Sequence, residues 1–149
     1  MIRPFSFSDL DYILQIERQS FPKSPYDWST FVGLYYSYPE TFWVYVSENV
    51  GQEKKQIGGY IVFSQDGHII SIAVHPHYRR RGIGKELLEK AIHYPSLKKV
   101  WAEVRKSNQR AQAFYLNMGF KITGVVPNYY GNEDALIVQW TPPSIIHSL

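Results

Sequence analysis

An arginine- and glycine-rich segment at residues 79–84 has residue types and spacing suited to binding an anion. It reads Arg-Arg-Arg-Gly-Ile-Gly and comes shortly after an apolar stretch at 69–74. A strand that leads through a glycine-containing turn into a helix directs backbone N–H groups and the positive end of the helix at one point. The glycines let an anion approach the backbone, and the arginines add charge. The segment therefore predicts a binding site for a phosphate-like anion.

Two common phosphate-binding motifs do not match this segment. A Walker A loop would need glycine where Arg79 stands and serine or threonine where Glu86 stands. A dinucleotide-binding fingerprint would need a third glycine where Leu87 stands. The pattern that does match is R-x-x-G-x-G, from Arg79 to Gly84. An ordinary strand, turn and helix with a solvated basic corner is the alternative interpretation.

Glu103 is a candidate for proton transfer, because it stands inside an apolar, strand-like stretch at 99–104. If its carboxylate faces inward, burial is costly and raises its pKa, which suits a general base. If alternation places Glu103 on a solvated face, it is expected to pair with a lysine. The alternation of apolar and polar residues leaves both interpretations open.

The composition describes a globular protein with an unusual share of aromatic residues. Of the 149 residues, 44% are hydrophobic, 19% are charged and 16% are aromatic, and 12 are tyrosines. The net charge of +3 suits an anionic cofactor but does not by itself indicate nucleic acid. Cysteine is absent, which excludes disulfides and thiolate chemistry. His75 and His77 flank Pro76, but no third ligand is evident, so no metal is expected.

Periodicity and turn residues predict an alternation of strands and helices. Strands are expected near residues 2–5, 41–48, 56–64, 68–74, 99–104, 121–126 and 135–140. Helices are expected near residues 9–20, 27–36, 83–94 and 107–118. Ser8 with Asp11 is the predicted cap of the first helix, and Ser107 that of the last. A polar turn is expected at 49–55.

This order predicts an α/β fold with a mixed, mostly antiparallel central sheet of about seven strands flanked by four helices. One domain is expected over residues 1–141, followed by a tail at 142–149 that contains two prolines. Polar and acidic residues interrupt any apolar run at the N-terminus, and no segment is long and apolar enough to span a membrane. A cytoplasmic location is therefore expected.

The motifs together resemble those of the GNAT N-acetyltransferases. The R-x-x-G-x-G segment is similar to the family's acetyl-coenzyme A loop, and residues 111–120 are similar to its A-x-x-x-Y-x-x-x-G-F helix. Residues 103–108, E-V-R-K-S-N, and 128–135, N-Y-Y-G-N-E-D-A, closely resemble the N-terminal acetyltransferases of the RimI type. The predicted order of elements is also that of the family, so the resemblance covers almost the whole chain.

The resemblance implies which residues bind acetyl-coenzyme A. The loop is expected to hold the pyrophosphate, and Asn108 is expected to bond the pantetheine arm, although simple helix capping would also explain Asn108. The residues expected to bind the coenzyme are Ile72, Ala73, Val74, Arg79, Arg80, Arg81, Gly82, Ile83, Gly84, Lys85, Asn108 and Tyr115.

The resemblance also implies catalytic roles. Glu103 is expected to take the proton of the amine, and Tyr115 is expected to protonate the departing sulfur. A phenol, with a pKa of about 10, is a fair match for an alkyl thiolate. As a bare pattern, an aromatic residue on a helix face is more often part of the core. His68 is a second-rank candidate for a base acting through water, although a lone histidine is usually structural.

The acceptor is expected to be a protein N-terminus, with a ribosomal protein among the candidates. In the family, two loops cover the first residues of the substrate, and here they contain Phe21, Pro22 and Tyr26, and the pair Tyr129 and Tyr130. The first loop is longer than in the bacterial ribosomal enzymes, which leaves the preferred first residue open. A small-molecule amine, a lysine side chain and a non-catalytic coenzyme A-binding module are the alternatives. No nucleic-acid or membrane partner is expected, and a monomer and a homodimer are both compatible with the sequence.

Overall fold

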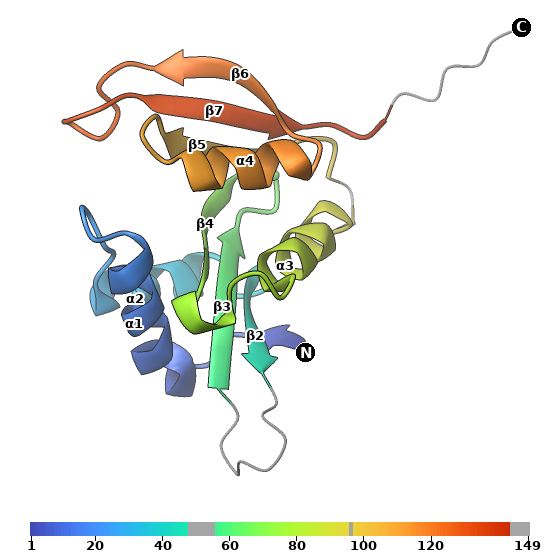
Figure 1. Cartoon of the computed structure of the whole chain (residues 1–149). Coiled ribbons are helices and arrows are strands. Elements are labelled where there is room, and N and C mark those ends of the chain that lie inside the picture. The colour runs from blue at the N-terminus through green and yellow to red at the C-terminus, as the bar shows by residue number, and fades with distance from the viewer. Residues whose placement is uncertain (48–55, 96, 144–149) are drawn as a thin grey trace, which may run out of the picture. The chain divides into compact units, whose positions relative to one another are not determined.

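The strands and helices follow one another in the order that the sequence predicts. The computed structural model describes residues 1–47, 56–95 and 97–143 (Figure 1). Its strands are β1 (Ile2–Pro4), β2 (Phe42–Ser47), β3 (Gln56–Phe63), β4 (Ile69–Val74), β5 (Val100–Arg105), β6 (Lys121–Val126) and β7 (Ala135–Trp140). Its helices are α1 (Leu10–Ser20), α2 (Trp28–Ser37), α3 (Ile83–Ile92) and α4 (Gln109–Asn117), with short 3-10 turns η1 (Phe7–Asp9) and η2 (Pro76–Tyr78). The turn predicted at 49–55 and most of the predicted tail, 144–149, lie outside the described residues.

The mixed α/β fold with seven strands and four helices is confirmed for the described residues, and its strands are divided between two antiparallel sheets. The first sheet has the order β1-β2-β3-β4, and the second has the order β5-β7-β6. The chain divides accordingly into two compact units. The first unit contains Met1–Gln65 and Ile69–Tyr94, and the second contains Asp66–His68 and the residues from Pro95 onward.

The first unit has helices on both faces of its sheet. Helices α1 and α2 cover one face and α3 covers the other (Figure 1). Ile13, Ile16 and Phe31 from α1 and α2 are fully buried together with Val44 and Tyr60 of the sheet. Because both faces are covered, the middle strand β3 is buried at nearly every position, which explains its continuous run of apolar residues.

Helix α3 lies close to the sheet because a glycine stands beneath it. A Cβ at Gly59 would lie 2.9 Å from the Ala73 carbonyl oxygen and 3.0 Å from the Ile83 side chain. Leu87 and Leu88 of α3 are fully buried. The start of α3, where the anion segment ends, is therefore fixed against the sheet by packing.

In the second unit, β5 shows the alternation that the sequence predicts. Val100, Ala102 and Val104 are buried, whereas Trp101, Glu103 and Arg105 are partly exposed. Tyr115 of α4 packs on Phe120 with ring centroids 5.1 Å apart, and both are buried. Alternation thus places Glu103 on the half-exposed face of the strand.

Two predicted helix caps are wrong. The turn η1 precedes α1, so the helical segment begins upstream of Ser8 and Asp11. The carboxylate that caps this segment is that of Asp9, which accepts from the Ser6 backbone N–H at 2.9 Å. At α4 the cap is Asn108, whose side-chain oxygen accepts from the Ala111 N–H at 3.0 Å. None of the helices in the described residues has the length and apolar character that a membrane span requires.

Candidate functional site

The arginine- and glycine-rich segment forms a turn that ends at the N-terminus of α3. Gly82 precedes the helix with a left-handed backbone, φ +79°, and Arg80 is left-handed as well, φ +65°. No side chain caps the helix at Gly82, and a Cβ there would meet nothing within 4 Å. The first N–H groups of a helix have no acceptor within it. The turn therefore presents open backbone donors and the positive helix end, as an anion site requires.

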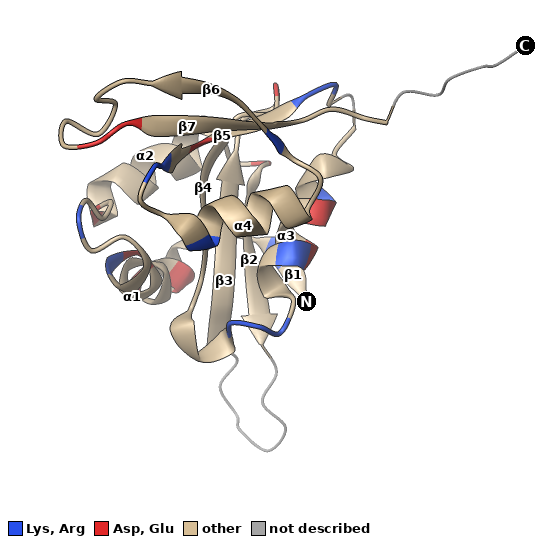
Figure 2. Ribbon diagram, turned by 45° about the horizontal axis from the view of Figure 1, so that its top comes forward, with Lys and Arg blue, Asp and Glu red and all other residues tan. Residues whose placement is uncertain are grey.

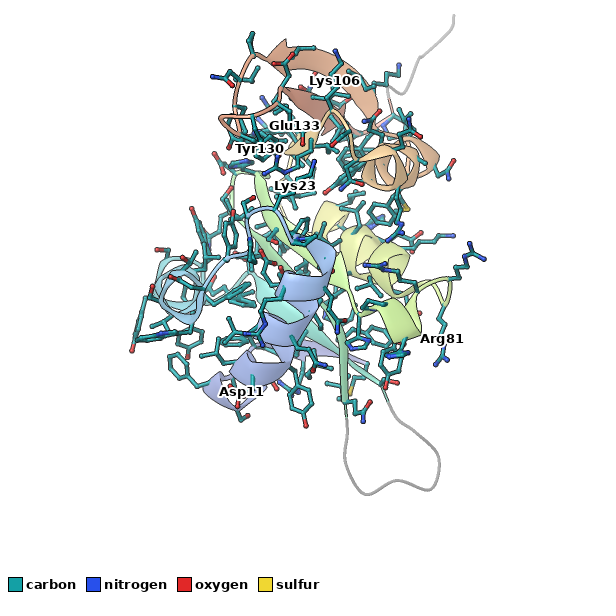
Figure 3. The ribbon with its side chains drawn as sticks, turned by 60° about the vertical axis from the view of Figure 1, so that its left-hand side comes forward. Asp11, Lys23, Arg81, Lys106, Tyr130 and Glu133 are labelled. Atoms are coloured by element: carbon teal, nitrogen blue, oxygen red, sulfur yellow. The ribbon has the colours of Figure 1, made fainter. Side chains whose placement is uncertain are left out.

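Three arginines belong to this turn, and Lys85 stands in the first turn of the helix that follows. Figure 2 shows Lys and Arg along the segment that leads into α3 and on the helix itself. Arg80 and Arg81 are exposed, and Arg81 extends away from the ribbon (Figure 3). The guanidinium carbon of Arg81 lies 5.3 Å from the centre of the Tyr78 ring, which orients the side chain without neutralising it. The charge of the turn remains available to a phosphate group.

Strand β4 forms an edge of its sheet. In the described residues of that sheet, β4 pairs only with β3. Ile72, Ala73 and Val74 therefore have one row of backbone groups without a strand partner in the sheet. An extended molecule with amide groups can bond to such an edge, which is what the pantetheine arm of coenzyme A offers.

In the second unit, the fold brings His68 and Glu103 together. His68 Nε2 and Glu103 Oε2 lie 2.7 Å apart, and the side chains are 29% and 19% exposed. The His68 ring also stacks on Trp101, with centroids 5.1 Å apart and planes inclined by 4°. The partner of Glu103 is thus a histidine and not the lysine considered from the sequence.

A glycine turn sets the position of His68. Gly67 has φ +102°, and a Cβ there would lie 1.9 Å from the Lys99 carbonyl oxygen, so only glycine fits. Its carbonyl accepts from the Trp101 N–H at 3.0 Å. His68 and Trp101 then form an isolated parallel bridge, which places the imidazole beside the Glu103 side chain.

The pair reverses the shift expected for the carboxylate. Burial by itself would raise the pKa of Glu103, but the hydrogen bond and charge of His68 outweigh it, so the pKa of Glu103 is lowered. The raised pKa considered for an inward-facing Glu103 is therefore not found. The hydrogen bond to Glu103 raises the pKa of His68 against the opposing effect of burial. The pair is best treated as one coupled acid–base group.

Tyr115 is buried, at 4% exposure, on helix α4. Burial is the largest cause of its raised pKa, and electrostatic interactions with Tyr130 and Glu103 raise it further. The phenol therefore keeps its proton at neutral pH and can act as a proton donor. Asn108 caps the same helix, so the capping interpretation of this residue holds.

Tyr129 and Tyr130 stand in the turn between β6 and β7. Their rings meet edge to face with centroids 4.9 Å apart, and Tyr129 is 50% exposed. Left-handed backbones at Asn128 and Gly131, φ +53° and +81°, tighten the turn. An exposed tyrosine on such a turn offers an apolar ring together with a hydroxyl that can form hydrogen bonds.

Arg105 and Glu133 support this turn, and neither was predicted as a site residue. The guanidinium carbon of Arg105 lies 4.1 Å from the centre of the Tyr130 ring, and its Nη1 donates to Glu133 at 2.9 Å. Glu133 also accepts from the Ser107 N–H at 3.1 Å and from the Ser107 hydroxyl at 3.0 Å, so the Ser107 side chain bonds to Glu133 and not to the start of α4. Figure 3 shows Tyr130 and Glu133 close to one another. Glu133 is part of the 128–135 motif, and this acidic residue was the feature of the sequence that could have indicated the contact.

The other predicted acceptor residues belong to the first unit. Phe21 ends α1 and is partly buried, Pro22 is exposed, and the Tyr26 ring packs on Phe31 with centroids 5.8 Å apart. The segment at 79–84, which is predicted to bind the coenzyme, and β4 lie in the same unit. The predicted proton-transfer residues and the tyrosine pair lie in the second unit.

The histidines beside the arginines have a local partner of their own. His75 Nδ1 accepts from the His77 N–H at 3.1 Å, and the two rings stack with centroids 5.0 Å apart. The part of the chain that the structure describes contains no group of three or more side chains suited to hold a metal ion.

Comparison with known proteins identifies the family. The model of the acetyltransferase (GNAT) family matches residues 10–120. The chain is 40% identical to an uncharacterised N-acetyltransferase of Methanocaldococcus jannaschii, over 97% of this chain and 93% of that protein. It is 33% identical to an N-alpha-acetyltransferase of Sulfurisphaera tokodaii, over 92% of this chain and 90% of that protein.

A solved structure agrees with these matches. The crystal structure of the ribosomal-protein-S18-alanine N-acetyltransferase from Escherichia coli matches with a TM-score of 0.77 and 28% identity, covering 100% of this chain and 97% of that one. The chain therefore belongs to the acetyltransferase (GNAT) family and is an N-acetyltransferase that uses acetyl-coenzyme A.

Proposed function

We propose that this enzyme acetylates the N-terminal α-amine of proteins or peptides. The observation that carries the proposal is the hydrogen bond of 2.7 Å between Glu103 and His68. A carboxylate with a lowered pKa is a modest base. At pH 7 about one α-amine in ten is already neutral, against about one lysine in 2,500. A modest base is sufficient for the first acceptor and poorly matched to the second.

The proposed reaction is direct attack of the amine on the thioester. The neutral nitrogen bonds to the carbonyl carbon of the acetyl group, and the tetrahedral intermediate collapses by breaking the carbon–sulfur bond. The amine proton passes through water to the Glu103–His68 pair, and the sulfur takes the proton of Tyr115. The raised pKa of Tyr115 keeps the phenol protonated at neutral pH, so its proton is in place when the sulfur departs. Exchange with solvent returns Tyr115 and the base to their starting forms.

Coenzyme binding is proposed for the residues of the first unit. The N–H groups of the turn at 79–84 and the start of α3 suit the pyrophosphate, and the free edge of β4 suits the pantetheine amides. Lys85 and the arginines contribute charge. Asn108, in the second unit, is proposed to bond the pantetheine arm in addition to capping α4.

The relatives support the choice of a protein N-terminus as acceptor. One is named an N-alpha-acetyltransferase, and the structural neighbour is named for acetylation of an alanine in ribosomal protein S18. The exposed Tyr129 and its neighbour Tyr130, together with Phe21, Pro22 and Tyr26, are the proposed contacts of the peptide. We also propose that residues 1–141 form the acetyltransferase domain, and that the enzyme acts in the cytoplasm, where new protein N-termini arise.

A peptide library tests the acceptor class. Free peptides that differ in their first residue are incubated with enzyme and acetyl-coenzyme A, alongside spermidine as a small amine, and products are identified by mass spectrometry. We expect acetylation of the α-amine in a subset of the peptides. Turnover of spermidine with no peptide product would reject the proposal.

A further inference from the structure

Glu17 is a buried carboxylate that none of the proposed steps uses. It lies on α1 and is only 2% exposed. Burial raises the pKa of Glu17, although hydrogen bonds from the Tyr26 backbone and the Tyr60 side chain act in the opposite direction. Carboxylates are almost never fully buried unless they have partners. The costly position of this group calls for a specific role.

The Glu17 carboxylate joins three segments of the first unit. Its Oε1 accepts from the Tyr26 backbone N–H at 3.0 Å, and its Oε2 accepts from the Tyr60 hydroxyl on β3. The Tyr60 oxygen in turn bonds to the Ser71 hydroxyl on β4 at 2.8 Å. A chain of hydrogen bonds thus runs from the loop after α1 through β3 to β4.

Glu17 also holds both ends of that loop. Its backbone carbonyl accepts from the Phe21 N–H at 2.8 Å, where the helix ends, while its side chain accepts from the Tyr26 N–H at 3.0 Å. The loop of residues 21–26 is therefore hydrogen-bonded at both ends to Glu17, at one end to its backbone carbonyl and at the other to its side chain. The loop contains two prolines and has no regular structure of its own, so these bonds fix its path.

We propose that Glu17 is a positioning residue for the acceptor, which sets how the loop of Phe21, Pro22 and Tyr26 meets the first residue of the substrate. This inference rests on the proposed function, because that function makes the loop an acceptor surface. Ser71 immediately precedes Ile72 to Val74, the proposed pantetheine edge. The network therefore ties the acceptor loop to the strand that is proposed to hold the coenzyme.

Three substitutions separate positioning from general stability. Glu17→Leu keeps the size but removes both acceptors of the side chain. Glu17→Gln can rebuild the network, because its oxygen accepts from Tyr26, its nitrogen donates to Tyr60, and Tyr60 then donates to Ser71. Tyr60→Phe keeps the ring but removes its hydrogen bonds to Glu17 and Ser71, while the Tyr26 N–H can still bond to Glu17.

Steady-state kinetics with a free N-terminal peptide measures the effect. Glu17→Leu is expected to raise the KM for the peptide about tenfold, since two donors lose their acceptor. The KM for acetyl-coenzyme A should stay within about twofold, because the substitution changes neither the turn at 79–84 nor the backbone edge of β4. Glu17→Gln should restore the peptide KM, and Tyr60→Phe should raise it about threefold. The altered loop should also change the ranking of first residues in the peptide library.

The outcomes distinguish this inference from the proposed function. If wild-type enzyme does not acetylate peptide N-termini, the proposed function fails and the inference fails with it. If wild-type enzyme does so and folded Glu17→Leu and Tyr60→Phe keep its peptide KM, only the inference is overturned. Equal increases in both KM values would likewise overturn it. Should Glu17→Leu not fold, Tyr60→Phe decides: a raised peptide KM with an unchanged coenzyme KM supports the inference, and an unchanged peptide KM overturns it.

Discussion

Glu103 and His68 each change the pKa of the other, and the direction of each shift fixes a pH dependence. The pKa of His68 is raised above its ordinary 6.5, so its pairing stabilises the fold fully below about pH 6.5 and is lost as pH rises through the raised pKa. The pKa of Glu103 is lowered below 4.5, so its pairing is present above pH 4.5 and is lost as pH falls through the lowered value.

The stability that the pair provides is therefore largest between these limits. His68→Gln is expected to lower the free energy of unfolding by on the order of 1 kcal/mol or less, as is usual for partly exposed pairs. In urea titrations, the difference from wild type should be greatest between about pH 4.5 and 6.5 and should shrink at higher pH. A difference that grows above pH 8 would show that the pair does not hold a charged histidine.

Glu103→Gln tests the base directly. Loss of one general base typically lowers kcat by about 10²–10⁴-fold. We expect a loss of that size, and we expect the remaining pH dependence of kcat/KM to follow the ionisation of the peptide amine alone. The profile of wild-type enzyme with the same peptide is the control. If Glu103→Gln keeps the wild-type rate and His68→Gln does not, His68 is the better candidate for the base. If both variants keep the wild-type rate, neither residue is the base.

Tyr115→Phe tests the proposed acid while preserving the packing of the ring on Phe120. We expect kcat to fall by about 10²–10⁴-fold, because the leaving sulfur loses its proton donor. The affinity for coenzyme A, measured by calorimetry, should change little. An unchanged kcat would assign Tyr115 to the core alone.

At the scale of elements, the turn before α3 can be tested apart from catalysis. Coenzyme A should raise the melting temperature of the wild-type enzyme, since a ligand at 100 times its Kd stabilises the native state by about 2.7 kcal/mol. Gly82→Glu should abolish this shift by placing a negative side chain where the anion is proposed to bind. Gly131→Glu is the matched control, because Gly131 also has a positive φ and open space around it.

The assignment of the pyrophosphate to this turn predicts one result. Coenzyme A no longer shifts the melting temperature of Gly82→Glu but still shifts that of Gly131→Glu. Both substitutions carry the same backbone strain and the same charge, so a general effect of either would appear in both. A full shift in Gly82→Glu would remove the pyrophosphate assignment from this turn.

The order of elements could be predicted from the sequence because it depends on local signals. The boundaries of β6 and β7 agree with the prediction, since alternation and flanking turn residues define both strands. The caps of α1 and α4 could not be predicted, because each depends on a competing partner: the turn η1 for Ser8, and Glu133 for Ser107.

The candidate site was predicted only in part, and the missing contacts are between residues distant in sequence. Glu103 was found by its position in a strand, but its partner His68 is 35 residues away and is set by the turn at Gly67. The sign of the Glu103 pKa shift follows from that partner, which alternation does not reveal. Glu17 and Tyr60, 43 residues apart, escaped prediction for the same reason.

For the molecule as a whole, the central claim is that the acceptor is an α-amine, and one peptide can test it. The peptide carries both a free N-terminus and an internal lysine, so that the two amines compete at equal concentration, and fragmentation mass spectrometry locates the acetyl group. We expect the α-amine to be acetylated at least about 100-fold faster, since the two pKa values differ by about 2.4 and the neutral fractions at pH 7 therefore differ by roughly 250-fold. The same peptide with a blocked N-terminus should not react. Comparable acetylation of the lysine, or equal rates on the free and blocked peptides, would contradict the account.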